Sequence, residues 1–352
     1  MTALAKPLDA ASEAGAFPGL DPVDLAVLDQ WQRDFPLCEA PFDVVADLHG
    51  LACDDLIARL SRLKAAGIVS RLGATVRPNT AGASTLAAMA VAPDRLDQVA
   101  AIVSQHPFVN HNYQREHGWN LWFVVTAPDA DELAASLDEL SAATGERVLA
   151  LPLEKPYHID LGFRLRRVAL LPSPASHVVV HRPRGQVEVD AADRRVLAAL
   201  EDGLPLTSEP YAGLARAAAM PVAELLGRLA SLTARGIVTR FGLILNHRAL
   251  GFRANAMAVW DVPDHMVDEV AASMVATGLV SLCYRRPRRR PDWPYNLFAM
   301  IHAQDRAAAR AILIEVNAIA GTRQFEQAVL FSTRCFKQRG AVFSARRREG
   351  AA

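Results

Sequence analysis

The sequence predicts an α+β protein made of a tandem repeat, in which a winged helix-turn-helix and a ferredoxin-like βαββαβ domain occur twice. Two observations lead to this fold class. The string GIVSRLG at 67–73 returns as GIVTRFG at 236–242, so one unit is present in two copies. In both copies apolar residues at helical spacing precede the string, and strand and helix patterns alternate after it.

Further matches keep the same order along the chain. AMAV recurs at 88–91 and 256–259, and NYQR at 112–115 corresponds to CYRR at 283–286. A chance similarity would not preserve this order. We therefore divide the chain into a flexible tail at 1–20, a winged helix-turn-helix at 21–73, a ferredoxin-like domain at 74–170, a linker at 171–186, a second winged helix-turn-helix at 187–242, a second ferredoxin-like domain at 243–340 and a flexible tail at 341–352.

The first part of each copy is expected to contain three short helices. In the first copy, Asp21 is an N-cap and Pro22 takes the first helical position. A second helix follows at 41–50, and a third at 52–66 ends before Gly67. Residues 68–78 are expected to fold back as a hairpin, which would be the wing.

The second part of each copy alternates strand and helix in the ferredoxin-like order. In the first copy we expect strands at 84–93, 108–116, 120–128 and 147–154, with helices at 94–106 and 129–145. The second copy repeats this order from 254 to 337. We expect the two halves to pack as a pseudo-dimer through these sheets.

Composition excludes several classes of protein. The 38 basic and 38 acidic residues cancel, which is unlike a dedicated DNA-binding protein. The four cysteines form no CxxC pair, so neither a disulfide framework nor a metal site is expected. No secretory signal or long apolar run occurs, so we expect a cytoplasmic chain without a membrane span.

The expected recognition helices argue against DNA binding. Their N-terminal residues should face base edges and phosphates. The first copy offers acidic residues there, Asp54 and Asp55, and acids repel phosphates. Arg59 and Arg62 lie further along the helix, where they could touch phosphates or form a solvated face.

The string HNYQREHGWNLWF at 111–123 combines residues that suit acid chemistry. The period of a strand places His111, Tyr113 and Arg115 on one face. Histidine exchanges protons near neutral pH, and the arginine fork binds carboxylates. His117, Trp119 and Asn120 follow within reach. The alternative is a half-exposed sheet face with solvated side chains.

The second copy keeps the anion-binding residues and lacks the histidines. Leu282 stands where the first copy has His111, whereas Tyr284 and Arg286 match Tyr113 and Arg115. An arginine-rich turn follows and ends in aromatic residues. This composition suits a flat polyanionic ligand, either a nucleic acid or a porphyrin that bears carboxylates; a solvated loop is the alternative.

Four long strings resemble the siroheme decarboxylases, which are Lrp/AsnC-like in fold, and resemble most the fused two-half form of heme d1 biosynthesis. They are VNHNYQREHGWNLWFVVTAPD, LPLEKPYHIDLGF, GFRANAMAVWDVP and SLCYRRPRRRPDWPYNLFAMIHA, and the resemblance covers about residues 20–340. It implies removal of CO2 from two acetate side chains of siroheme, giving 12,18-didecarboxysiroheme. No added cofactor is implied, because siroheme itself carries the iron.

The residues then take the following hypothetical roles. Each acetate becomes a methyl group, so a proton must reach the carbon that loses CO2, and a general acid is required. We expect His111 and His117 to be the acids, with help from Tyr113. The residues expected to bind substrate are Arg115, Trp119, Asn120, His158, His247, Tyr284, Arg285, Arg286, Arg288 and Asn296.

Some alternatives stay open at this point. His158 can be a surface histidine, and His247 can be a linker histidine or touch the ligand or its iron. The partners expected are siroheme and either further copies of this chain or paralogous decarboxylase subunits. The alternative function is a heme- or tetrapyrrole-sensing regulator of the Lrp/AsnC type that binds DNA.

Overall fold

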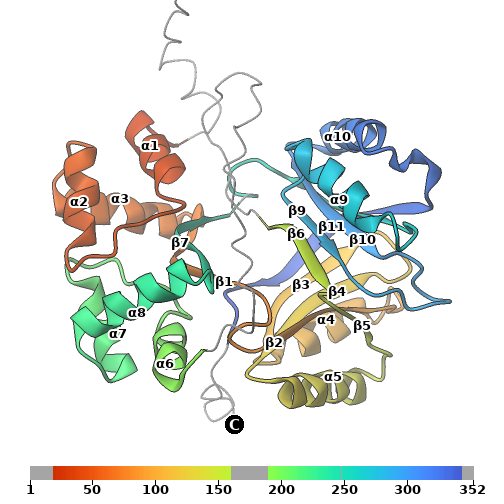
Figure 1. The fold of residues 1–352 in the computed structure, drawn as a ribbon, viewed down its shortest axis with the longest axis horizontal. Helices are drawn as coiled ribbons and strands as arrows, with labels where there is room; N and C mark the ends of the chain where they lie inside the picture. The colour runs from red at the N-terminus through yellow and green to blue at the C-terminus, as the bar shows by residue number, and fades with distance from the viewer. Residues whose placement is uncertain (1–18, 160–188, 247, 343–352) are drawn as a thin grey trace, which may run out of the picture.

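The structure is a computed structural model that describes residues 19–159, 189–246 and 248–342. The expected linker and almost all of both expected tails lie outside these ranges. Figure 1 shows two bodies, with the helix-turn-helix parts of both halves on the left and both ferredoxin-like domains on the right.

The two helix-turn-helix parts pack together around one shared core. Their helices are α1 (Pro22–Gln30), α2 (Pro41–Leu48) and α3 (Cys53–Ala65) in the first half, and α6 (Ala191–Ala199), α7 (Pro210–Ala218) and α8 (Val222–Ala234) in the second. Asp21 caps α1 as expected, because its side chain accepts a hydrogen bond from the backbone of Asp24. Phe42 and Leu56 of the first half share one hydrophobic cluster with Tyr211 and Leu229 of the second.

The expected wing hairpin at 68–78 is wrong. Strand β1 (Val69–Val76) instead pairs antiparallel with its counterpart β7 (Val238–Leu245), with Gly73 opposite Gly242. Each half contributes one strand, and pairing the two satisfies backbone groups that a single strand would leave open. A Cβ atom at Gly242 would lie 2.5 Å from the carbonyl oxygen of Trp31, so this crossing requires glycine.

Each half then forms the expected ferredoxin-like sheet. The first half contains β2 (Ala83–Met89), α4 (Leu96–Gln105), β3 (Val109–Arg115), β4 (Leu121–Ala127), α5 (Ala130–Thr144), β5 (Leu149–Pro152) and an additional strand, β6 (Lys155–Ile159). The second contains β8 (Ala254–Trp260), α9 (Val267–Ala276), β9 (Leu282–Arg285), β10 (Leu297–Ala303), α10 (Arg306–Ile319), the short 3-10 helix η1 (Thr322–Gln324) and β11 (Gln327–Gln338). The strand orders β5-β2-β4-β3 and β11-β8-β10-β9 are equivalent, which confirms the repeat.

The halves exchange their last strands. The end of β11 pairs with β3 of the first half, so that Ser332 lies opposite Arg115. In the same way, β6 of the first half pairs with β9 of the second. The result is one nine-stranded sheet that runs through both halves. This confirms the pseudo-dimer.

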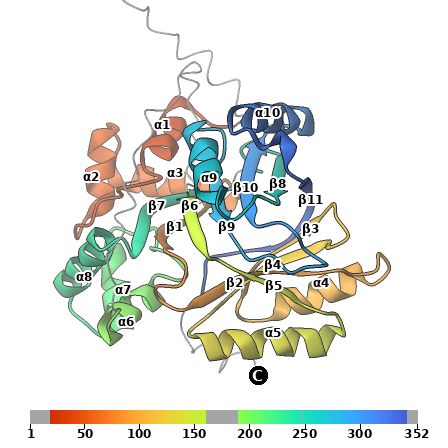
Figure 2. The ribbon, with the colours of Figure 1, turned by 45° about the vertical axis from the view of Figure 1, so that its right-hand side comes forward.

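The helix-free faces of the two halves meet in an aromatic core. Figure 2 shows α4 and α5 on one outer side and α9 and α10 on the other, with the strands between them. One buried cluster between the halves contains Trp122 of β4, Phe298 of β10 and Trp293, which lies in the turn before β10. We call the side of the sheet that carries this cluster the inter-half face.

The register also corrects one sequence match. Met89 lies opposite Leu121, whereas Leu297, the counterpart of Leu121, lies opposite Trp260. Met89 therefore corresponds to Trp260 and not to Met257. The AMAV strings match in composition but occupy different positions in their strands.

Candidate functional site

The polar row on β3 is formed as expected. The rings of His111 and Tyr113 stack with their centroids 6.2 Å apart. The guanidinium carbon of Arg115 lies 5.7 Å from the centre of the Tyr113 ring. Asn112 projects from the other face, where its amide donates to the carbonyl oxygen of Ala100 in α4. The three side chains therefore share the inter-half face.

Arg115 is a buried cation that uses a backbone acceptor. Only 7% of the residue is exposed, and burial lowers its pKa to about 10. Its Nη1 donates to the carbonyl oxygen of Leu330 at 3.1 Å, and its Nε has no partner among the described residues. Within that part of the chain, Arg115 forms no ion pair. A buried guanidinium of this kind favours an anionic ligand.

Arg286 repeats this arrangement in the second half. Its guanidinium carbon lies 4.7 Å from the centre of the Tyr284 ring, and its Nη1 donates to the carbonyl oxygen of Leu151. Burial lowers its pKa as well. Each arginine thus stacks on a tyrosine of its own half and reaches a strand of the other half, β11 for Arg115 and β5 for Arg286.

Two further arginines lie near the β3 row, and the sequence argument missed both. Arg71 of β1 is close enough that its charge, after burial, contributes to lowering the pKa of His111 to about 4. The charge of Arg248 acts on Tyr113 and Arg115. Arg71 holds the same position in GIVSRLG that Arg240 holds in GIVTRFG, so its recurrence in both copies was a usable indication.

Tyr113 is held as a neutral phenol. Burial raises its pKa above the usual value, and the neighbouring Cys335 of β11 raises it further. A neutral phenol can donate a hydrogen bond to a carboxylate. The row on β3 therefore offers one cation, one hydroxyl and one imidazole on a single face.

His117 and Trp119 lie in the turn after β3, next to the aromatic core. The Nδ1 atom of His117 accepts from the backbone of Trp119 at 3.0 Å, and its ring centroid lies 5.4 Å from that of Trp293. Burial lowers the pKa of His117. The Trp119 indole donates to the carbonyl oxygen of Asp292. These contacts link His117 to the core rather than to the row that starts at His111.

Asn120 and Asn296 hold equivalent loops. The Asn120 side chain accepts from the backbone N–H of Val91 and donates to its carbonyl oxygen. Asn296 makes the same pair of bonds with Val262. The structure therefore shows a scaffold role for both amides, and substrate contact by either residue stays a prediction.

Several arginines of the arginine-rich turn form ion pairs with carboxylates of the chain itself. Arg285 forms ion pairs with Glu154 and Asp264, and Arg288 pairs with Asp264 and with Asp261. The anion clamp expected from Tyr284, Arg285, Arg286 and Arg288 is thereby reduced. Its buried member without a carboxylate partner in the described chain is Arg286.

The two remaining histidines differ in what the structure describes. His158 lies on β6, opposite Cys283 of β9, so it is next to the strand of the second half that carries Tyr284. His247 lies outside the described residues.

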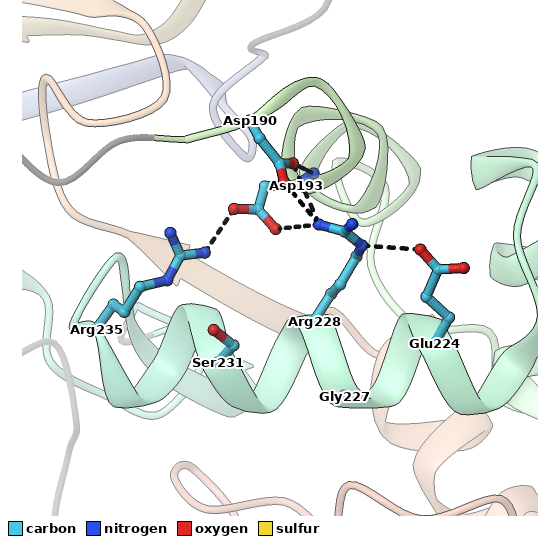
Figure 3. A pocket seen from close by; sticks show the side chains of 7 residues that line it. All are labelled: Asp190, Asp193, Glu224, Gly227, Arg228, Ser231 and Arg235. Atoms are coloured by element: carbon cyan, nitrogen blue, oxygen red, sulfur yellow. Dashed lines mark hydrogen bonds and ion pairs between the residues drawn. The ribbon is translucent and has the colours of Figure 1, made fainter.

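A cavity of about 560 Å³ lies on the second helix-turn-helix, away from the β3 row. Figure 3 shows Arg228 between Asp190, Asp193 and Glu224, while Arg235 reaches Asp193. The first half repeats this arrangement, because Asp24 binds both Arg59 and Arg62. These arginines are committed to carboxylates, which argues for a structural cluster and weakens a phosphate-binding role.

None of the described helices is long and apolar enough to cross a membrane. Over the same residues, no group of three or more histidine, cysteine, aspartate or glutamate side chains could hold a metal ion.

Known proteins resemble the chain along almost its whole length. Residues 24–69 and 193–238 match the siroheme decarboxylase NirDL-like HTH domain, and residues 81–158 and 249–337 match the AsnC-like ligand binding domain. The siroheme decarboxylase NirDL subunit of Paracoccus denitrificans is 45% identical over 92% of this chain and 98% of its own. The siroheme decarboxylase NirD subunit of Pseudomonas aeruginosa is 45% identical over 42% of this chain and 97% of its own.

A solved structure agrees with these matches. The crystal structure of the siroheme decarboxylase NirDL in co-complex with an iron-uroporphyrin III analogue has a TM-score of 0.66 and 26% identity. The alignment covers 92% of this chain and 97% of that one. Family, fold and internal repeat agree, and this chain belongs to the siroheme decarboxylase NirDL family.

Proposed function

We propose that this chain is a siroheme decarboxylase, a carboxy-lyase that converts siroheme to 12,18-didecarboxysiroheme in heme d1 biosynthesis. The observation that carries the proposal is the pair of buried arginines, Arg115 and Arg286. Neither forms an ion pair with a carboxylate in the described chain, although a buried cation needs a negative partner. Siroheme brings many carboxylates and a flat ring to a face lined with tyrosine, histidine and tryptophan.

The dimensions of the β3 row suit a large ligand. Alternate residues on one face of a strand are about 6.7 Å apart, so His111 and Arg115 are separated by about 13 Å along β3. One carboxylate cannot meet both side chains at that distance. Arg115 therefore anchors one carboxylate of the macrocycle, and the reacting acetate lies toward His111.

The reaction breaks one C–C bond and forms one C–H bond. The carboxylate leaves as CO2, and the bonding electron pair stays on the methylene carbon, where the macrocycle delocalises it. A proton then completes the methyl group. His111 supplies that proton, and Tyr113 orients the acetate through its phenol. The iron belongs to the substrate, and the proposal requires no added cofactor.

The environment of His111 explains how its proton would be loaded. Without a ligand, burial and Arg71 keep the pKa of His111 at about 4, so the ring is neutral at pH 7. A carboxylate beside the ring favours the charged form and raises that pKa. Binding of the substrate would thus bring a proton to the residue that delivers it.

The decisive experiment is anaerobic incubation of the purified chain with siroheme, followed by mass spectrometry for the loss of one and two CO2. We expect both losses. His111→Gln should bind siroheme, as followed by visible absorbance, and should lose turnover by at least about a hundredfold. Full turnover of this variant would remove His111 from the mechanism, and no CO2 loss by the natural chain would refute the function.

The regulator alternative has less support. The acidic start of α3 and the ion pairs of Arg59 and Arg62 leave little positive charge for phosphates. A gel shift with genomic fragments tests it directly. For its partners, we propose assembly with further copies or with paralogous subunits, because half-length family members are named as subunits. Light scattering of the purified chain alone, and again after it is mixed with paralogous subunits, measures this assembly.

A further inference from the structure

A polar row crosses the inter-half face at right angles to β3. It starts at Arg115 on β3 and continues through Ser332 of β11, which lies opposite Arg115. The next strand is β8, where the register that pairs Phe331 with Ala256 brings Asn255 beside Ser332. We call Arg115, Ser332 and Asn255 the transverse row.

His302 of β10 lies beside the transverse row, next to Asn255. It lies opposite Asn255, and its Nε2 is 3.2 Å from the Asn255 amide nitrogen. Its Nδ1 is 2.8 Å from the hydroxyl of Ser281, which also donates to the carbonyl oxygen of Met300. The amide nitrogen is a donor, so Nε2 accepts and Nδ1 carries the proton.

All members of the row share one face of the sheet. On β8, Met257 and Val259 belong to the cluster between the halves, which places Asn255 on that face by alternation. On β10, Phe298 and Met300 place His302 there in the same way. The row therefore lies on the same surface as His111 and Tyr113.

Each member of the row keeps one buried polar atom without a partner in the described chain. These atoms are Nε of Arg115, Oγ of Ser332 and Oδ1 of Asn255. Arg115, Ser332 and Asn255 are each at least nine-tenths buried, so bulk water does not supply the missing hydrogen bonds. Three such atoms on three neighbouring strands mark a place where a polar ligand completes the bonding.

The equivalent row that begins at Arg286 of the second half is different. The positions equivalent to Arg115, Ser332, Asn255 and His302 are Arg286, Leu153, Ser84 and Thr126. Ser84 bonds to Asn79, and Thr126 accepts from Asn110, so these two hydroxyls are satisfied within the protein. Leu153 packs against the aromatic core and offers no polar atom. The halves thus share a scaffold, and the open row is confined to the one that begins at Arg115.

We propose that the transverse row is a second carboxylate subsite, in which Arg115 Nε, Ser332 Oγ and the Asn255 amide bind a carboxylate of the substrate. The proposal rests on the proposed function and adds a second arm to that site. Two strand spacings of about 4.8 Å make the row about 10 Å long. The two arms meet at Arg115 and span a tetrapyrrole with its side chains rather than a small acid.

His302 is a positioning residue in this proposal. If the Asn255 amide turns over, its nitrogen faces the ligand and donates, while its Oδ1 accepts from a proton on His302 Nε2. The Nε2–H tautomer or the charged ring of His302 supplies that proton, and the Nδ1–H tautomer does not. His302 therefore sets which end of the Asn255 amide faces the substrate.

The test measures siroheme affinity by visible absorbance and CO2 loss by mass spectrometry in the full chain. Asn255→Asp places a negative charge in the row and should weaken siroheme binding at least about tenfold, and Ser332→Ala should weaken it severalfold. The matched controls are Ser84→Ala and Thr126→Ser in the row that begins at Arg286, which should leave affinity within about twofold. Equal effects in both rows, or unchanged affinity in Asn255→Asp, would overturn the subsite.

The role of His302 is tested through coupling. His302→Ala should weaken siroheme binding in the natural chain but have no further effect in an Asn255→Ala background. Additive losses would show that His302 acts independently of Asn255 and would refute its positioning role. If the natural chain binds siroheme without releasing CO2, the proposed function fails while the affinity measurements still decide the subsite.

Discussion

The guanidinium of Arg115 donates to the carbonyl oxygen of Leu330 in the other half, and Arg286 donates in the same way to Leu151. Leu330 and Leu151 occupy equivalent positions, because they lie opposite Met257 and Leu86 in their sheets. Each half therefore supplies a backbone acceptor to the buried cation of the other. The candidate site depends on both halves at once.

Replacement of Arg115 by methionine should separate stability from function. A buried cation without a carboxylate partner lowers stability, and an apolar side chain of similar length removes that cost. We expect Arg115→Met to raise the free energy of unfolding by about 1–3 kcal/mol, and with it the unfolding temperature. The same variant should lose siroheme binding. Calorimetry and visible titration measure the two effects. Arg288→Met, which breaks ion pairs with carboxylates, should not gain stability.

His111 should make stability depend on pH in acid. Its pKa of about 4 in the folded chain is below the usual 6.5, so the unfolded chain binds more protons between these values. The folded chain therefore keeps its full stability with respect to His111 above about pH 6.5, and this contribution is lost as the pH falls toward 4. Urea unfolding at several pH values should show that the advantage of the natural chain over His111→Asn shrinks by about 2 kcal/mol across this window. A constant difference would contradict the neutral buried imidazole.

The ion-pair clusters of the helix-turn-helix parts should matter for stability alone. Asp193 is 3% exposed and binds both Arg228 and Arg235. We expect Asp193→Asn to lower the unfolding free energy by about 1–3 kcal/mol, a range below that of fully buried pairs because the arginines are partly exposed. Thermal unfolding measures the loss. Siroheme affinity should stay unchanged, and a parallel loss of affinity would place the cluster in the substrate site.

Turnover should distinguish His111 from His117. The ring of His111 stacks on Tyr113, whereas His117 accepts from the backbone of its own turn and touches Trp293. His117→Gln should therefore lower turnover by less than about tenfold, against at least about a hundredfold for His111→Gln. The measured quantity is CO2 loss at saturating siroheme. Equal losses would restore His117 as a proton donor.

Local features of the fold could be read from the sequence because local chemistry decides them. The Asp21 cap and the alternation that places His111, Tyr113 and Arg115 on one face needed no knowledge of the other half. The pairing of β1 with β7 could not be read in this way. The pairing of these two strands, which are far apart in the chain, competes with a hairpin formed within one half. The core that both helix-turn-helix parts share brings β1 and β7 together.

The sequence predicted the candidate site along β3 and at Arg286, but not the transverse row. Ser332, Asn255 and His302 come from three strands of the second half, and their common face exists only after β11 has joined β3. The ion pairs of the arginine-rich turn could not be predicted from the sequence for a related reason. Glu154, which pairs with Arg285, belongs to the first half. Asp261 and Asp264, which pair with Arg288, lie in the loop between β8 and α9, where no periodic sequence pattern indicates their position.

The exchange of β6 and β11 has a consequence for the evolution of the single chain. A half made alone would lack the strand that completes the edge beside its own tyrosine and arginine, so a lone half would expose an unpaired edge and a buried cation to solvent. Halves made as separate chains would each need a partner chain to supply that strand. Joining them in one reading frame provides both halves in equal amounts and allows each half to carry residues that the other lacks, as Leu282 shows at the position equivalent to His111.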